Sequence, residues 1–168
     1  MIHVCSLARL HATVEETGAR RVVTLMRDVE LVRRPPTIAD ADHLRLRFDD
    51  ISEPIDGYTV PAEEHIAELL AFVRKWDRAT PLVMHCYAGV SRSTAGAFVS
   101  VCALNPTRAE ADIARALRRL SPTATPNIRI VALADRMLGR DGRMVAAIEA
   151  IGRGVECYEG HPFRLDLA

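Results

Sequence analysis

A cysteine and an arginine separated by five residues are the side chains of this chain best suited to chemistry. Cys86 and Arg92 lie in the run HCYAGVSRS, which spans residues 85–93. A thiolate is a strong nucleophile, and the planar guanidinium of an arginine can hold two oxygens of a phosphate. The run follows an apolar segment and leads into a helical pattern. Backbone N–H groups and a helix N-terminus can therefore surround a bound oxyanion, with Cys86 at its floor.

This arrangement predicts transfer of a phosphoryl group to sulfur. Cys86 would attack phosphorus in line with the leaving oxygen and form a phosphocysteine intermediate. The positive potential of the helix N-terminus would favour the thiolate form of its sulfur. Arg92 and the backbone donors would stabilise the equatorial oxygens in the transition state. The expected phosphate-binding residues are Tyr87, Ala88, Gly89, Val90, Ser91 and Arg92.

Short apolar segments and amphipathic segments alternate along the chain and must position this loop. Strands are predicted at Ile2 to Leu7, Arg21 to Met26, Leu44 to Phe48 and Pro81 to Cys86. Helices are predicted at His11 to Ala19, Pro61 to Trp76, Thr107 to Leu120 (with a capping box from Thr107 to Glu110), from Thr125 to Gly139 and at Arg143 to Ile151. Strands separated by helices predict an α/β fold, with a central, mostly parallel β-sheet flanked by helices in three layers. Ligands bind such sheets at the carboxyl ends of the strands.

Length and composition narrow the class of protein. The chain has 168 residues, 49% of them hydrophobic, so we expect one domain over residues 1–155 with a C-terminal tail at 156–168. The 22 basic and 22 acidic residues balance, which argues against nucleic acid as a partner. The four cysteines include no C-x-x-C pair, so no metal and no cofactor are expected. No segment is long enough for a membrane span and no signal peptide is recognised, which predicts a cytoplasmic protein.

The run HCYAGVSRST resembles the His-Cys-x5-Arg-Ser signature of the protein tyrosine phosphatase superfamily, and looks most like its compact dual-specificity branch. The resemblance implies that Cys86 is the nucleophile and Arg92 the phosphate clamp. It also implies that His85 shapes the loop and that the Ser93 hydroxyl assists breakdown of the intermediate. More loosely, the resemblance extends over residues 2–138.

The resemblance also points to a supporting residue and to a general acid. The segment from Ser121 to Asn127 is similar to one that braces the phosphate loop in the family, although Asn127 could equally be an ordinary first-turn residue. The family places an acidic residue after a strand, some thirty residues before the cysteine. Asp50 lies 36 positions before Cys86 and is preferred over Asp49, which remains an alternative. Both could also simply cap the following turn. Glu53 and Asp56 are less suited, because they lie further from the strand end.

The function expected from these features is a protein phosphatase acting on phosphotyrosine, and on phosphoserine or phosphothreonine if the cleft is shallow. Its partner would be a phosphorylated protein or peptide, and the oligomeric state is not predicted. A phosphoinositide phosphatase is an alternative, although the five residues after Cys86 carry no charge to neutralise extra phosphates. A phosphoprotein-binding pseudophosphatase is another. The five-residue spacing argues against a rhodanese-like sulfurtransferase, whose loops are typically one residue shorter.

Overall fold

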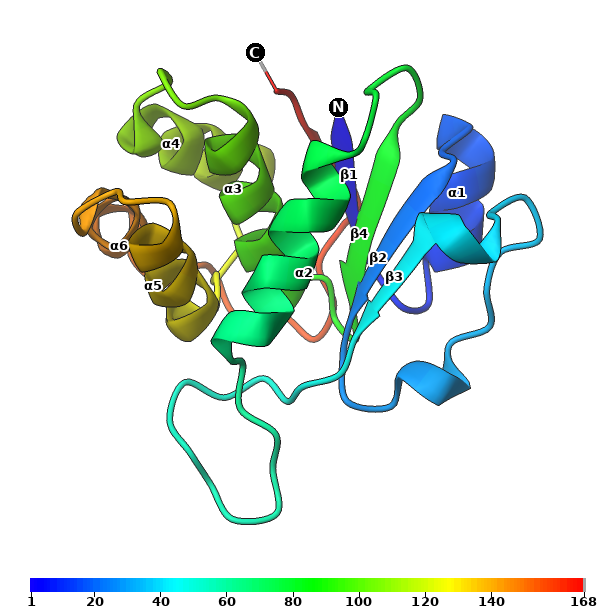
Figure 1. The fold of residues 1–168 in the computed structure, drawn as a ribbon, viewed down its shortest axis with the longest axis horizontal. Helices are drawn as coiled ribbons and strands as arrows, with labels where there is room; N and C mark the ends of the chain where they lie inside the picture. The colour runs from blue at the N-terminus through cyan, green and yellow to red at the C-terminus, as the bar shows by residue number, and fades with distance from the viewer. Residues whose placement is uncertain (168) are drawn as a thin grey trace.

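The short apolar runs of the sequence form a five-stranded sheet in the computed structural model, which describes residues 1–167 (Figure 1). The strands are β1 (Ile2–Ser6), β2 (Arg21–Leu25), β3 (His43–Leu46), β4 (Leu82–Cys86) and β5 (Phe163–Leu165). Their order is β3-β2-β4-β1-β5. The first four strands are parallel to their neighbours, whereas β5 runs antiparallel to β1. The predicted central, mostly parallel sheet is confirmed.

Helices cover both faces of this sheet and bury two separate apolar clusters. On one side lies α1 (Leu10–Thr17); on the other lie α2 (Glu63–Arg74), α3 (Arg92–Leu104), α4 (Glu110–Leu120), α5 (Ile128–Met137) and α6 (Arg143–Ile151) (Figure 1). Alternate residues of β4 point to opposite faces. Val83 packs in the smaller cluster with α1, and Met84 packs in the larger one with α3. The three-layer α/β class predicted from the sequence is therefore the observed one.

The central strand β4 ends at Cys86, which therefore lies at the carboxyl ends of the parallel strands. Every residue of β4 is buried, and Ser6 at the end of β1 is in register with Cys86. Helix α3 packs closely behind β4, since a Cβ atom at Gly96 would lie 2.5 Å from Sδ of Met84. The loops that follow β1, β3 and β4 consequently meet at the carboxyl edge, where a ligand site is expected.

Several helix starts differ from those predicted. The capping box predicted from Thr107 to Glu110 is wrong, because α4 begins at Glu110 with Ala109 as its N-cap and no side chain caps it. Helix α5 begins at Ile128 rather than near Thr125, and Asn127 is its N-cap. Local sequence patterns do not determine which residue is the N-cap of a helix, because the direction of the preceding loop sets the backbone angles at that residue.

The segment after α6, which we expected to be a tail, lies against the rest of the domain. It continues from Gly152 past residues 87–91, the loop between β4 and α3, and ends in β5 beside β1. The amide of Gly160 donates to the carbonyl of Ala88 at 2.9 Å. The carboxyl edge of the sheet is therefore flanked by residues from the start, the middle and the end of the chain. Across residues 1–167, the helices are all too short or too polar to cross a membrane.

Candidate active site

The loop between β4 and α3 curls tightly under the end of β1. Cys86 is the last residue of β4 and is 2% exposed, and α3 begins six residues later at Arg92. Gly89 has a φ of +73°, and a Cβ atom there would lie 2.8 Å from backbone atoms of both Cys5 and Ser6. Only glycine combines this left-handed backbone with so close an approach. The contact with β1 thus fixes the curvature of the loop.

We expect Gly89→Ala to be strongly destabilising. The added methyl group would have to displace backbone atoms of β1 and would also occupy a left-handed conformation, which alone costs about 1–2 kcal/mol. We expect the free energy of unfolding, measured by urea denaturation, to fall by more than about 2 kcal/mol. Gly18→Ala is the matched control, because Gly18 has a φ of +66° with no atom near its Cβ position. Equal losses in the two variants would contradict the role given to the β1 contact.

The carbonyl groups of the loop point outward and are held by donors from other segments. The carbonyls of Tyr87 and Val90 accept hydrogen bonds from the amides of Leu7 (3.1 Å) and Thr125 (2.9 Å). The carbonyl of Ala88 accepts from Gly160, as described above. Within the described chain, the backbone N–H groups of residues 87–91 donate to no protein acceptor. Outward carbonyls and unpaired amides in one tight turn form a nest that suits an anion.

Ser93 lies beside the sulfur of Cys86 in the first turn of α3. Its Oγ is 3.1 Å from Sγ of Cys86, and the Ser93 side chain is fully buried. The hydroxyl can donate to a sulfur anion when the S–P bond breaks. Burial raises the pKa of both Cys5 and Cys102 to about 12, so these two thiols stay protonated at neutral pH. Neither is therefore a competing nucleophile.

Arg92 lies at the N-terminus of α3 with its guanidinium beside the loop. One terminal nitrogen, Nη1, donates to the carbonyl oxygen of Phe48 at 3.1 Å. Its Nε is buried and has no hydrogen-bond partner among residues 1–167. Asp50 provides the nearest carboxylate, with Oδ2 at 4.0 Å from Nε. An unpaired buried donor of a charged group beside a nest of amides fits a bound phosphate, because such a donor is costly unless a ligand satisfies it.

The two adjacent aspartates after β3 have different surroundings. Asp49 is largely buried and closes the loop of residues 47–62 that extends beyond the sheet (Figure 1), because its Oδ2 accepts from the amide of Thr59 at 2.8 Å. The amide of Asp49 also donates to the carbonyl of Thr59 at 2.7 Å, and Nη1 of Arg27 lies 3.5 Å from its Oδ1. The contacts of Asp49 are those of a residue that shapes a loop.

Asp50 instead lies at the rim of the phosphate loop. Its side chain is 37% exposed, and its Oδ1 accepts from Oγ of Ser91 at 2.7 Å and from Nδ2 of Asn127 at 2.8 Å. Asn127 also caps α5, since its Oδ1 accepts from the amides of Arg129 and Ile130. The structure thus brings Asp50 and Asn127 together with Ser91 of the loop between β4 and α3.

We expect Asp50→Asn to slow turnover according to the leaving group. For a phosphorylated alkyl alcohol, which cannot depart as an anion, kcat/KM should fall by about 10²–10⁴-fold, the usual contribution of a general acid. For p-nitrophenyl phosphate, whose leaving group needs little protonation, the loss should be much smaller. Asp49→Asn is the control and should affect both substrates equally, through stability. Steady-state kinetics on the two substrates would contradict the role of Asp50 if its variant showed no dependence on the leaving group.

His85 belongs to a buried polar chain behind the loop. Its Nε2 lies 2.7 Å from Oγ1 of Thr24, which in turn lies 2.8 Å from Nε2 of His43. The hydroxyl of Thr24 can donate its one proton to only one of the two imidazole rings, so the other ring must donate an N–H to Oγ1. Burial lowers the pKa of His85 to about 4 and that of His43 to about 3. Both rings are neutral at pH 7 and connect β4 to β2 and β3 below the loop.

The lowered pKa values of these two histidines predict a loss of stability in mild acid. In the unfolded chain each ring takes up a proton below a pKa of about 6.5, whereas in the folded chain it does so only near pH 4 or 3. Protons therefore favour the unfolded state, and the stability falls as the pH drops below 6.5. Each histidine should remove about 2 kcal/mol between pH 6.5 and 5. Urea denaturation of His43→Gln should show a shallower pH dependence than the unchanged chain, and an identical dependence would refute the assignment.

Sequence reasoning did not anticipate some residues around the loop. Thr24 is a polar residue in an otherwise apolar strand, and that contrast was a usable signal. The carbonyl of Phe48 and the contact from Gly160 have no sequence signal, because they depend on where distant backbone segments meet. Among residues 1–167, no group of three or more His, Cys, Asp or Glu side chains is arranged to hold a metal ion.

Residues 56–123 match the family model described as protein-tyrosine phosphatase. Solved structures that share the fold include the following three. Human DUSP28 is 16% identical, with a TM-score of 0.64 over 83% of this chain and 88% of that one. The PTP-2 phosphatase of Cydia pomonella is 19% identical, with a TM-score of 0.63 over 80% and 84%. PTPMT1 in complex with PI(5)P is 14% identical, with a TM-score of 0.59 over 88% and 93%. A search of curated proteins gives no match.

Proposed function

We propose that this chain, a phosphatase of the protein tyrosine phosphatase superfamily with the compact dual-specificity type of fold, hydrolyses phosphotyrosine and other phosphomonoesters of protein side chains through a phosphocysteine intermediate. The observation that carries the proposal is the phosphate loop. Its backbone amides are unpaired, Cys86 lies at its floor, and the buried Nε of Arg92 has no acceptor within residues 1–167. All three features suit a tetrahedral dianion bound above a sulfur.

The reaction would proceed in two displacements at phosphorus. First, the S–P bond to Cys86 forms while the bond to the ester oxygen breaks, and Asp50 gives its proton to that oxygen. Then a water molecule attacks the phosphocysteine, Asp50 takes the proton from the water, and the sulfur leaves as a thiolate. Ser93 would stabilise this leaving sulfur, because its hydroxyl lies 3.1 Å from Sγ. Arg92 and the loop amides hold the equatorial oxygens in both steps.

The position of Asp50 supports its role as acid and base. It is the carboxylate nearest the Arg92 guanidinium and is held by Ser91 and Asn127, so its oxygens stay close to the bound phosphate. Asn127 would then act as a positioning residue through Asp50. Positioning of this kind reduces the entropy that the reacting groups must lose.

A phosphoinositide is the second candidate substrate. The fold shared with PTPMT1, whose structure contains PI(5)P, favours it. The side chains of the phosphate loop argue for a protein substrate, because residues 87–91 include no lysine or arginine to neutralise further phosphates. We also propose a reducing location such as the cytoplasm, because Cys5, Cys86, Cys102 and Cys157 are all free thiols.

A side-by-side substrate panel tests the proposed function. Purified chain should hydrolyse p-nitrophenyl phosphate, with vanadate blocking the reaction, and should release phosphate faster from phosphotyrosine peptides than from phosphoinositide vesicles of matched phosphate content. Faster phosphate release from the vesicles would favour a phosphoinositide as the substrate. Absence of turnover on every substrate, with vanadate still binding, would identify a phosphoprotein-binding pseudophosphatase instead.

A further inference from the structure

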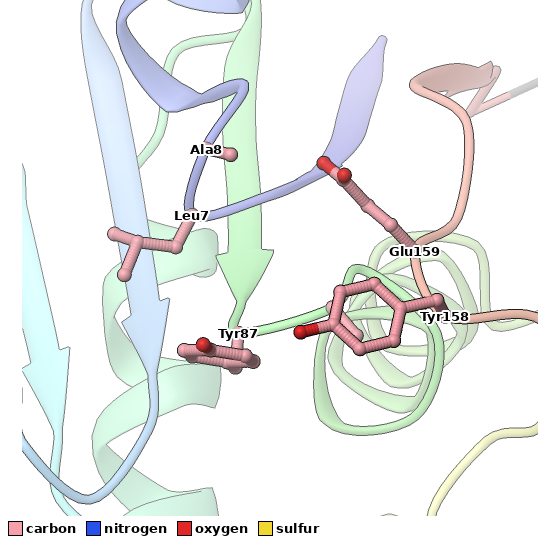
Figure 2. Close-up of a pocket in the computed structure, with 6 residues that line it drawn as sticks. Leu7, Ala8, Tyr87, Tyr158 and Glu159 are labelled. Atoms are coloured by element: carbon pink, nitrogen blue, oxygen red, sulfur yellow. The ribbon is translucent and has the colours of Figure 1, made fainter.

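A cavity borders the phosphate loop on the side of β1. It has a volume of about 210 Å³, enough for one large side chain, and Figure 2 shows the residues that line it. They come from three distant segments and are Leu7, Ala8, Tyr87, Ala88, Tyr158 and Glu159. Tyr87 and Ala88 are the two residues directly after Cys86. A side chain in this cavity would therefore belong to a residue close to the phosphorylated one.

The C-terminal segment that forms one wall of the cavity is fixed in place. Gly160 is buried, its amide donates to the carbonyl of Ala88 at 2.9 Å, and a Cβ atom there would lie 3.0 Å from the carbonyl oxygen of Gly89. On the other side, the amide of Val155 donates to the carbonyl of Pro122 at 3.0 Å. The hydroxyl of Ser6 donates to Oε1 of Glu159. A preformed wall of this kind binds a ligand without first having to become ordered.

The lining of the cavity suits a long side chain with a cationic end. Tyr158 is 92% exposed and points its hydroxyl toward Tyr87 in Figure 2, so aromatic surface from two segments borders the space. Leu7 and Ala8 add an aliphatic wall. Glu159 extends its carboxylate toward the segment after β1 and forms no ion pair within the described residues. Aromatic faces and an unneutralised carboxylate attract a guanidinium or an ammonium group.

We propose that this cavity is a subsite for an arginine or lysine side chain of a phosphopeptide, at a position flanking the phosphorylated residue. The inference rests on the proposed function, because it assumes that a phosphopeptide occupies the adjacent loop. Glu159 pairs with the cationic group, Tyr158 and Tyr87 contact its aliphatic part and the cation, and Ala8 borders the stem. The C-terminal segment thus takes part in choosing the substrate.

Phosphotyrosine peptides that differ only by arginine or citrulline test the subsite, because citrulline has the size of arginine without its charge. The arginine or citrulline is placed in turn at each of the two positions before the phosphotyrosine and each of the two positions after it. We expect kcat/KM of the unchanged chain to favour arginine by roughly tenfold at one of these positions. The Cys86→Ser variant gives a second readout that needs no turnover, the ratio of dissociation constants for the same two peptides.

Variants then assign the preference to the cavity. Glu159→Gln keeps an oxygen that can accept from Ser6, and we expect it to remove the larger part of the arginine-to-citrulline ratio, leaving only the contribution of the two tyrosines. Tyr158→Leu should lower the ratio part of the way. Glu156→Gln is the matched control and should retain the full ratio, because Glu156 is an exposed carboxylate of the same segment that pairs with Arg153 and lies outside the cavity. Because each ratio is measured within one variant, a general loss of folded protein cancels.

The possible failures are distinguishable. Equal use of both peptides by the unchanged chain, or a preference that Glu159→Gln leaves undiminished, overturns the subsite and leaves the phosphatase reaction standing. Absence of p-nitrophenyl phosphate hydrolysis overturns the proposed function. In that case the ratio of dissociation constants still decides the subsite, since a binding protein would show the same preference for arginine.

Discussion

Cys86→Ser is expected to lower kcat/KM for p-nitrophenyl phosphate by at least about a thousandfold, as loss of a covalent nucleophile does in other enzymes. A serine hydroxyl in this position would keep its proton, because among residues 1–167 no carboxylate or imidazole forms a hydrogen bond with the Cys86 side chain. Its hydrogen-bond partner is the hydroxyl of Ser93, with Oγ at 3.1 Å from Sγ. The fold should persist, since oxygen is smaller than sulfur and the loop amides are unchanged.

The measurement is steady-state hydrolysis together with calorimetric titration of inorganic phosphate or vanadate. The Cys86→Ser chain should still bind phosphate while turnover is lost, which separates binding from chemistry. Cys157→Ser is the control with the same atom exchange at an exposed, unreacting cysteine, and it should retain full activity. Retention of more than a tenth of the activity by Cys86→Ser would rule out sulfur as the nucleophile.

Arg92→Lys is expected to lower kcat/KM by about 10³-fold, the order found when a transition-state donor to phosphate is removed. Lysine keeps the positive charge but cannot hold two oxygens in a plane. It also cannot donate to the carbonyl of Phe48 and offer a second donor to phosphate in the same geometry, whereas Arg92 donates to that carbonyl through Nη1 and keeps Nε without a partner among residues 1–167. The effect should therefore come from geometry rather than from net charge.

Arg129→Lys is the matched control for this substitution. Arg129 also donates to backbone carbonyls close to the site, those of Pro61 at 2.7 Å and Ser52 at 3.2 Å, but it does not border the phosphate loop. We expect its kcat/KM to change by less than tenfold, with any change in stability seen in thermal unfolding. If both arginine variants lost activity to the same degree, Arg92 would have no special role as a phosphate clamp.

Local sequence was sufficient for the fold class and for the tight turn between β4 and α3. The strand before Cys86, the glycine of the turn and the helix after Arg92 are contiguous, so short-range sterics and hydrogen bonding determine how they follow one another. The alternation of apolar strands and amphipathic helices likewise predicted the parallel sheet, because each pattern reports which face an element buries. The roles of Cys86, Arg92, Ser93 and Asp50 in catalysis stay predictions that the experiments above address.

Helix starts and the choice between the two aspartates depended on more than local pattern. Asp49 and Asp50 are adjacent, so their distance along the chain from Cys86 does not separate them. Only the folded loop shows that Asp49 is bonded to Thr59 while Asp50 faces Ser91 and Asn127. The predicted capping box at Thr107 failed for a related reason, since a cap depends on the direction in which the chain enters the helix.

By itself, the sequence determined the order of β1 to β4 and of the helices, and the tight turn between Cys86 and Arg92, because these features arise from neighbouring residues. The tertiary structure alone decided the position of the C-terminal segment. Ser6 and Glu159 are 153 residues apart, and β5 is only three residues long, too short for a periodic signal. A contact between such distant residues forms only when burial and strand pairing repay the loop entropy, and that balance is a property of the whole fold.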